Sequence, residues 1–135
     1  MRNPLLFKLF LLFGFTLLLA GCENFDLFQS EDTLNQKVQA RWTLVRLPAT
    51  NPQEYWTFES GMVYREIMSN PMRYDTGTYK ISTTLDNATI DLEGFKDTLS
   101  KISAPWDIVR LDDKIFFIAT DKNGDPGVAQ REFYR

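Results

Sequence analysis

Cys22 is the residue of this sequence with the most definite chemistry, because it is the only cysteine and ends the run Leu19-Ala20-Gly21-Cys22. A single cysteine excludes a disulfide framework within the chain and any multi-cysteine metal site. Positive charge at Arg2 and Lys8 comes first, and the largely apolar run 9–19 follows. A positive start, an apolar centre and small residues before a cleavage site are typical of a secretory signal peptide.

The residues that end at Cys22 resemble the lipobox of bacterial lipoproteins. The resemblance implies that residues 1–21 are a cleaved signal peptide, and that Cys22 receives a diacylglyceryl group and usually an N-acyl chain such as palmitate. The run 9–19 is well short of the ~20 apolar residues that span a bilayer, so acyl chains would hold the protein on the membrane at ~0.8 kcal/mol per buried CH2. We therefore expect a lipid-anchored envelope protein. The outer membrane is favoured over the inner one, because Glu23 differs from the aspartate that resembles an inner-membrane retention signal.

The composition narrows the function of the remaining chain. Without Arg2 and Lys8, thirteen basic residues face eighteen acidic ones, which gives a net charge of about −5. The arginines are scattered singly, so we expect no nucleic-acid partner. Histidine is absent, which removes the usual catalytic triads and His-based zinc sites. Catalysis by carboxylates alone stays open, but the sequence around the acidic residues singles out no pair of them. We therefore expect no enzyme activity, no cofactor and no metal.

Two charged segments have simple interpretations. The loop 121–127 has oxygen-bearing side chains at alternate positions, as a calcium loop has, but Pro126 stands where the sharp turn needs glycine. The loop is therefore predicted to be an ordinary turn. Alternating charges on a solvated sheet face are predicted for one hairpin, at Arg65, Glu66, Arg73 and Asp75.

The sequence after the signal peptide divides into a tether, residues 22–29, and one domain, residues 30–135. A short helix is predicted at the start of the domain, since Ser30 can cap it and Leu34 with Val38 forms an apolar i, i+4 pair. We expect this helix to lie against the domain as a lid or plug.

From Arg41 onward, apolar and polar residues alternate with period two, and turn residues recur at short intervals. Strands are predicted over 41–47, 54–59, 62–68, 74–82, 88–92, 106–111, 115–120 and 128–134. The segment 95–103 fits either a strand with a late turn or a short helical crossing, and Gly77 suggests a bulge or bend. The pattern indicates an all-β fold, a barrel or sandwich, and we expect a small antiparallel eight-stranded barrel because closure removes exposed edges.

The order of these elements resembles the small lipocalin-like lipoproteins of Gram-negative bacteria, particularly those of the Bacteroidetes type. The matching segments cover most of 40–135 and are 41–44, 55–59, 75–81, 90–92, 106–111, 115–118 and 132–133. Arg41 precedes Trp42, so the glycine-x-tryptophan start of true lipocalins is missing. The resemblance implies a barrel whose inward side chains either fill it or line a cup.

Six large side chains are predicted on inward phases of the strands. They are Trp42, Trp56, Phe58, Tyr79, Ile90 and Trp106. As ligand-binding residues they would hold a small hydrophobic molecule; as core residues they would close the barrel. The sequence thus leaves two functions open: binding of a small apolar ligand, or a structural or interaction role in an envelope complex with a packed barrel and no small-molecule ligand. The expected partners are the membrane, through the lipid anchor, and either that ligand or an envelope protein.

Overall fold

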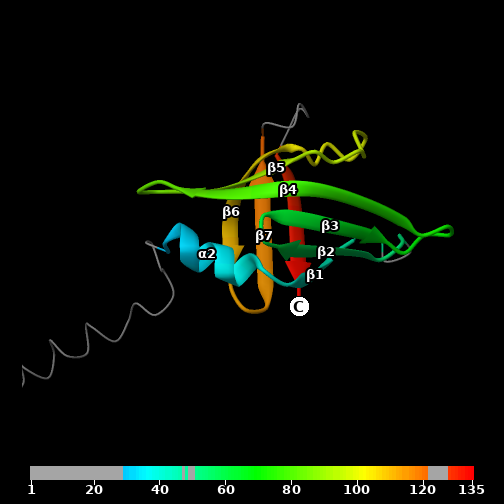
Figure 1. Ribbon diagram of the computed structural model, residues 1–135, viewed down its shortest axis with the longest axis horizontal. Helices are drawn as coiled ribbons and strands as arrows, with labels where there is room; N and C mark the ends of the chain where they lie inside the picture. The colour runs from blue at the N-terminus through cyan, green and yellow to red at the C-terminus, as the bar shows by residue number, and fades with distance from the viewer. Residues whose placement is uncertain (1–28, 47, 49–50, 122–127) are drawn as a thin grey trace, which may run out of the picture.

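The computed structural model describes residues 29–46, 48, 51–121 and 128–135, and these form a closed antiparallel β-barrel with one short helix (Figure 1). The helix is α2 (Glu31–Val38). The strands are β1 (Arg41–Leu44), β2 (Glu54–Glu59), β3 (Met62–Ile67), β4 (Arg73–Thr83), β5 (Ala88–Glu93), β6 (Ala104–Leu111), β7 (Ile115–Thr120) and β8 (Ala129–Tyr134). Each strand pairs with the next and β8 pairs with β1, which confirms the predicted all-β, eight-stranded barrel.

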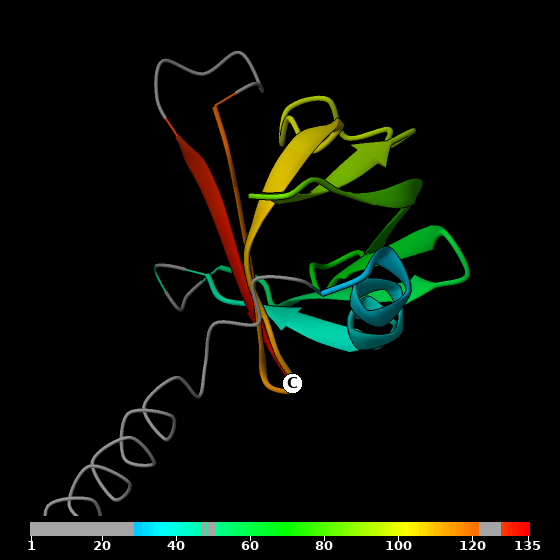
Figure 2. The same cartoon turned by 90° about the vertical axis from the view of Figure 1, so that its left-hand side faces the viewer.

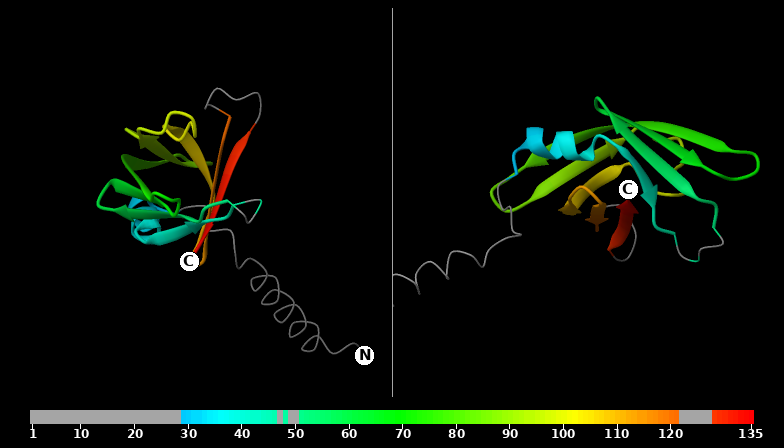
Figure 3. Two further views of the ribbon diagram at one scale, coloured as in Figure 1. Left: turned by 90° about the vertical axis from the view of Figure 1, so that its right-hand side faces the viewer. Right: turned by 90° about the horizontal axis from the view of Figure 1, so that it is seen from below.

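The up-and-down order gives the barrel two unlike ends. The α2 helix, the β2–β3, β4–β5 and β6–β7 turns and the end of β8 lie at one of them, called here the helix end. The β1–β2, β3–β4, β5–β6 and β7–β8 connections lie at the other, the loop end. The view from below shows α2 and the β3–β4 turn at opposite ends (Figure 3).

The α2 helix forms where the sequence predicts it. Ser30 accepts a hydrogen bond from the Thr33 amide at 3.3 Å, as an N-cap does. Leu34 and Val38 are buried in the barrel core, so the helix covers the helix end as a plug (Figure 2). Arg135 adds to this closure, because its guanidinium lies 4.5 Å from the centroid of the Trp42 ring.

The strands alternate buried and exposed residues as the sequence predicts. Trp42 and Leu44 point inward on β1, and Ile90 and Leu92 do so on β5. The closing contact between β1 and β8 is short, with two residue pairs in register, whereas β2 and β3 share six.

The segment 95–103 is neither a strand nor an α-helix. It contains a turn over 98–101, in which Lys101 has φ +45°, and its ends are buried at Phe95 and Ile102. The apolar residues that suggested an element here are therefore anchors that hold a loop onto the barrel.

Gly77 does not make the bulge that the sequence suggests, because the register of β4 with β3 continues through it. The irregularity lies instead in β6, between Ile108 and Arg110. Glycine is needed at position 77 for space: a Cβ there would lie 2.5 Å from the Glu93 carbonyl oxygen and 2.6 Å from Phe95 Cε2.

We therefore expect Gly77→Ala to destabilise the barrel by about 1–3 kcal/mol, since Phe95 and the β5 backbone must shift to admit a methyl group. Thr76→Ala, on an exposed position of the same strand, is the matched control. Urea unfolding curves of both variants measure the effect. A Gly77→Ala midpoint equal to that of Thr76→Ala would contradict this account of the glycine.

No helix among the described residues is both long and apolar enough to cross a membrane.

Candidate functional site

The barrel interior has an aromatic layer next to α2. All six residues predicted on inward phases are buried, including Trp42, Phe58 and Tyr79 in this layer. The rings of these last three residues contact one another or another core ring. The Phe58 and Tyr79 ring centroids are 5.3 Å apart, and the Trp42 centroid lies 5.6 Å from that of Phe116. Burial raises the pKa of Tyr79, against the effect of its hydrogen bonds to the Gly61 backbone and the Gln39 side chain.

The three tryptophan N–H groups donate to acceptors within the barrel. Trp42 Nε1 donates to the Val38 carbonyl at 2.8 Å, and Trp106 Nε1 donates to the Ile102 carbonyl at 2.9 Å. Trp56 Nε1 donates to Glu54 at 2.7 Å. The indoles are therefore fixed by the barrel itself, as core tryptophans are.

A second, charged layer fills the interior toward the loop end. Glu54 and Arg65 are only 1% and 4% exposed, because they occupy the inward phase of β2 and β3 alongside Trp56 and Val63. Arg131 occupies the matching phase of β8, two residues before the buried Phe133. The solvated charged face predicted for the β3–β4 hairpin is therefore wrong for Arg65, which points into the barrel.

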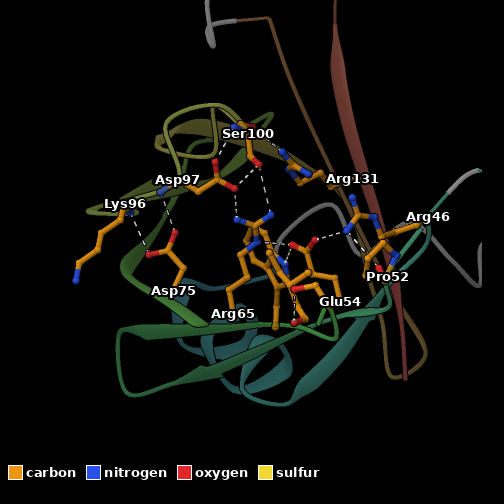
Figure 4. Close-up of polar contacts among 12 residues, drawn as sticks. Arg46, Pro52, Glu54, Arg65, Asp75, Lys96, Asp97, Ser100 and Arg131 are labelled. Atoms are coloured by element: carbon orange, nitrogen blue, oxygen red, sulfur yellow. Dashed lines mark hydrogen bonds and ion pairs between the residues drawn. The ribbon is translucent and has the colours of Figure 1, made fainter. Parts of the chain in front are cut away.

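Glu54 is the hub of the charged layer (Figure 4). Arg65 donates to one of its carboxylate oxygens through Nε, and Trp56 donates to the same oxygen. Arg46, from the connection after β1, donates to the other oxygen at 2.9 Å. Two arginines thus share one buried carboxylate.

The β5–β6 loop contributes the remaining side chains of the charged layer from the loop end. Arg65 Nη1 donates to Asp97 at 2.7 Å, and the Ser100 hydroxyl donates to the same oxygen at 2.6 Å. The hydrogen bond from Ser100, together with Arg65, lowers the pKa of Asp97 to about 2. Asp75 fixes this loop, because it accepts the backbone N–H groups of Lys96 and Asp97 at 3.1 and 3.0 Å.

The charge of Arg65 is stabilised inside the barrel. Burial by itself would lower its pKa, but the hydrogen bonds to Glu54 and Asp97 outweigh burial, and the pKa is raised.

Arg131 is bound differently. Its Nη2 donates to the Ser100 carbonyl at 2.8 Å, and its guanidinium lies 5.3 Å from the Trp106 centroid and 5.9 Å from that of Trp56. Its Nε is buried and has no hydrogen-bond partner among the described residues. Burial lowers the pKa of Arg131, and the nearby charges of Arg65 and Arg46 act in the same direction.

A guanidinium presents planar donors that match a carboxylate or phosphate, and in this layer Arg46 and Arg65 use theirs on Glu54 and Asp97. Within the described residues, no three His, Cys, Asp or Glu side chains come together as a metal site. The calcium-like loop falls largely on residues 122–127, which lie outside the described residues.

Comparisons with protein-family models, with curated proteins and with solved structures give no match for this chain. The resemblance to lipocalin-like lipoproteins therefore stays a prediction.

The charged layer was missed in the sequence, although a signal for it exists. Glu54 lies two residues before the inward Trp56, and Arg131 lies two residues before the inward Phe133. A charged residue on the inward phase of a predicted strand is therefore the pattern to search for.

We expect Glu54→Ala to destabilise the protein by about 3–5 kcal/mol, because it leaves Arg65 charged and buried without its main partner. Glu66→Ala is the matched control. It breaks the exposed pair of Glu66 with Arg41 at 2.7 Å, which we expect to cost no more than about 1 kcal/mol. Chemical denaturation of the two variants gives both values, and equal losses would show that the buried carboxylate is not the hub.

Proposed function

We propose that the protein is a lipid-anchored envelope lipoprotein whose barrel binds a small, largely apolar molecule at its loop end. The observation that carries this proposal is a group of exposed apolar side chains on the loop-end connections. They are Val45, Met68, Met72, Leu99 and Val128.

The position of these side chains supports binding. They come from four separate connections, which the topology brings to one end of the barrel. Several exposed apolar side chains at one end of a barrel, near polar groups inside it, favour a binding site there over single exposed residues. Of the six residues predicted to bind a ligand, Trp56 and Trp106 border the charged layer, because the guanidinium of Arg131 lies 5.9 Å and 5.3 Å from their ring centroids. The other four, Trp42, Phe58, Tyr79 and Ile90, are packed in the hydrophobic core.

The anchor in this proposal is Cys22, after removal of residues 1–21 and with residues 22–29 as a tether. Its support is the lipobox-like sequence Leu19-Ala20-Gly21-Cys22 and the absence of any other cysteine. An anchored barrel of the lipocalin-like class would present its loop end to molecules of the envelope, on the outer membrane in preference to the inner one.

We expect the protein, expressed in a Gram-negative bacterium, to incorporate an alkyne analogue of palmitate and to fractionate with membranes. Cys22→Ser removes the acylated sulfur, so the variant is expected to lose the label and to keep residues 1–21. Glu23→Gln is the control, since it leaves the thiol in place. Intact-mass measurement checks both results, and an unmodified Cys22 thiol in the membrane-bound protein would overturn the anchor.

For the ligand, we expect saturable binding of the uncharged fluorophore N-phenyl-1-naphthylamine to the chain from Cys22 carrying Cys22→Ser. This chain keeps α2, every strand and the whole core, which lies between Leu34 and Phe133. Leu99→Asp, at a loop-end side chain that is 93% exposed, is expected to weaken the binding by about fivefold or more because it replaces an apolar contact by a charge.

Leu85→Asp is the matched control, since Leu85 is 86% exposed in the β4–β5 turn at the helix end. It is expected to bind the fluorophore like the parent chain. Equal effects of the two substitutions would mean that the loop end is not the binding site.

A second function, docking to an envelope protein through a packed barrel, is favoured by the β3–β4 hairpin. Tyr64, Met68, Met72 and Tyr74 are all exposed there, and tyrosine and methionine are enriched in protein interfaces. A folded domain that shows no saturable binding of the fluorophore would favour this second function.

A further inference from the structure

Among the described residues, the positive charges of the charged layer outnumber its negative charges by one. It contains the guanidinium groups of Arg46, Arg65 and Arg131 and the carboxylates of Glu54 and Asp97 (Figure 4). Burial disfavours the charge of Arg131, as do Arg65 and Arg46, whereas Glu54 and Asp97 favour it. Within the described part of the chain, the layer has no third carboxylate that pairs with Arg131.

The distribution of contacts places this excess at Arg131. Arg65 is paired with both Glu54 and Asp97, and Arg46 is paired with Glu54. Arg131 forms no ion pair with a described residue; its hydrogen bond runs to the neutral carbonyl of Ser100. An arginine stays charged at neutral pH even when its surroundings disfavour the charge. A partly buried cation of this kind is stabilised by an anion from outside the protein.

The guanidinium is also held in place for such an anion. The Ser100 carbonyl accepts from Nη2, and the guanidinium carbon lies 5.9 Å from the ring centroid of Trp56 on β2 and 5.3 Å from that of Trp106 on β6. Nε is a buried donor that has no hydrogen-bond partner among the described residues. A donor group fixed before binding loses little conformational entropy when the ligand arrives.

We infer that the ligand of the loop end is an amphiphile with an anionic group, a carboxylate or a phosphate, which binds Arg131. This inference rests on the proposed ligand-binding function and names the class of ligand. The anionic group enters the charged layer, and the apolar part lies at the loop end against exposed side chains such as Leu99.

The net charge of the chain does not by itself favour an anionic ligand, so a preference for one has to come from Arg131. The chain has a net charge of −3, so its overall field does not gather anions. An anionic amphiphile that binds must therefore find a specific positive group, and an uncharged amphiphile of the same shape lacks that contact.

Two related fluorophores test the inference on the Cys22→Ser chain from residue 22. Anilinonaphthalene sulfonate carries an anionic group, and N-phenyl-1-naphthylamine is its uncharged counterpart. We expect Arg131→Gln to weaken the anionic fluorophore by about tenfold or more, the range of one charge-assisted contact, and the uncharged one by less than twofold. Arg110→Gln is the matched control, because Arg110 pairs with Asp112 at the helix end. It is expected to change neither affinity.

Arg131→Lys guards against a folding defect in the glutamine variant, with near-ultraviolet circular dichroism as the check of folding. Lysine keeps the charge but loses the planar donors, so a smaller loss of the anionic fluorophore is expected. A folded Arg131→Gln variant that binds the anionic fluorophore like the parent chain overturns the inference, and so does an Arg131→Lys variant that loses as much binding as Arg131→Gln while both are folded. If the parent chain binds neither fluorophore, the proposed ligand-binding function fails as well.

Displacement of the anionic fluorophore identifies the chemical group. Decanoate or decyl phosphate is expected to compete at concentrations at least tenfold below those of decanol, and the stronger of the two tells whether the site prefers a carboxylate or a phosphate. Decanol that competes equally well overturns the need for an anion. Inorganic phosphate that competes as well as decyl phosphate overturns the amphiphile, since the site would then take a free ion.

Discussion

The interior ion pair between Glu54 and Arg65 is the constraint on which the loop end of this barrel depends. Both groups are almost fully buried, so each must be satisfied inside the protein. Glu54 meets this need by accepting from Arg65, Arg46 and Trp56 together, and Arg65 does so by reaching Asp97 in the β5–β6 loop. The pair thereby links four parts of the chain: β2, β3, the segment after β1 and the loop that crosses the opening. A barrel with a leucine at each position would pack, but it would lose the contact that holds this loop.

The two layers of the interior contribute differently to the structure. The aromatic layer, closed by α2, supplies apolar burial, and its polar N–H groups are satisfied by nearby acceptors such as the Val38 carbonyl. The charged layer contributes less to stability, because desolvation offsets much of the attraction between buried charges. It contributes order instead, since Arg131 is held by a backbone carbonyl and two indole rings. The proposed ligand site lies in this ordered, incompletely neutralised part of the barrel.

Much of the fold follows from the sequence, while the charged layer does not. Period-two alternation identifies the strands, and Ser30 with Leu34 and Val38 identifies the helix, because these signals are local. Which charges meet is a property of the closed barrel: Glu54 and Arg65 face each other only through the β2–β3 register, and Asp97 reaches them from a loop 32 positions after Arg65. The requirement for glycine at position 77 could not be predicted from the local sequence either. The ring that leaves no space for a Cβ there belongs to Phe95, which follows the next strand. Local patterns therefore predicted the elements, and contacts between distant elements had to come from the structure.

The brief pairing of β1 with β8 gives the barrel a seam. Two residue pairs close it, Thr43 with Tyr134 and Leu44 with Phe133, whereas the neighbouring β7–β8 ladder extends over six. The Val45 N–H adds one backbone hydrogen bond across the seam, to the Glu132 carbonyl at 2.8 Å, and the pairing is still the shortest ladder of the barrel. The strand on one side of this seam carries Arg131, and the segment that follows the other strand carries Arg46. A separation of these two edges would therefore uncover the charged layer from the side, next to both arginines.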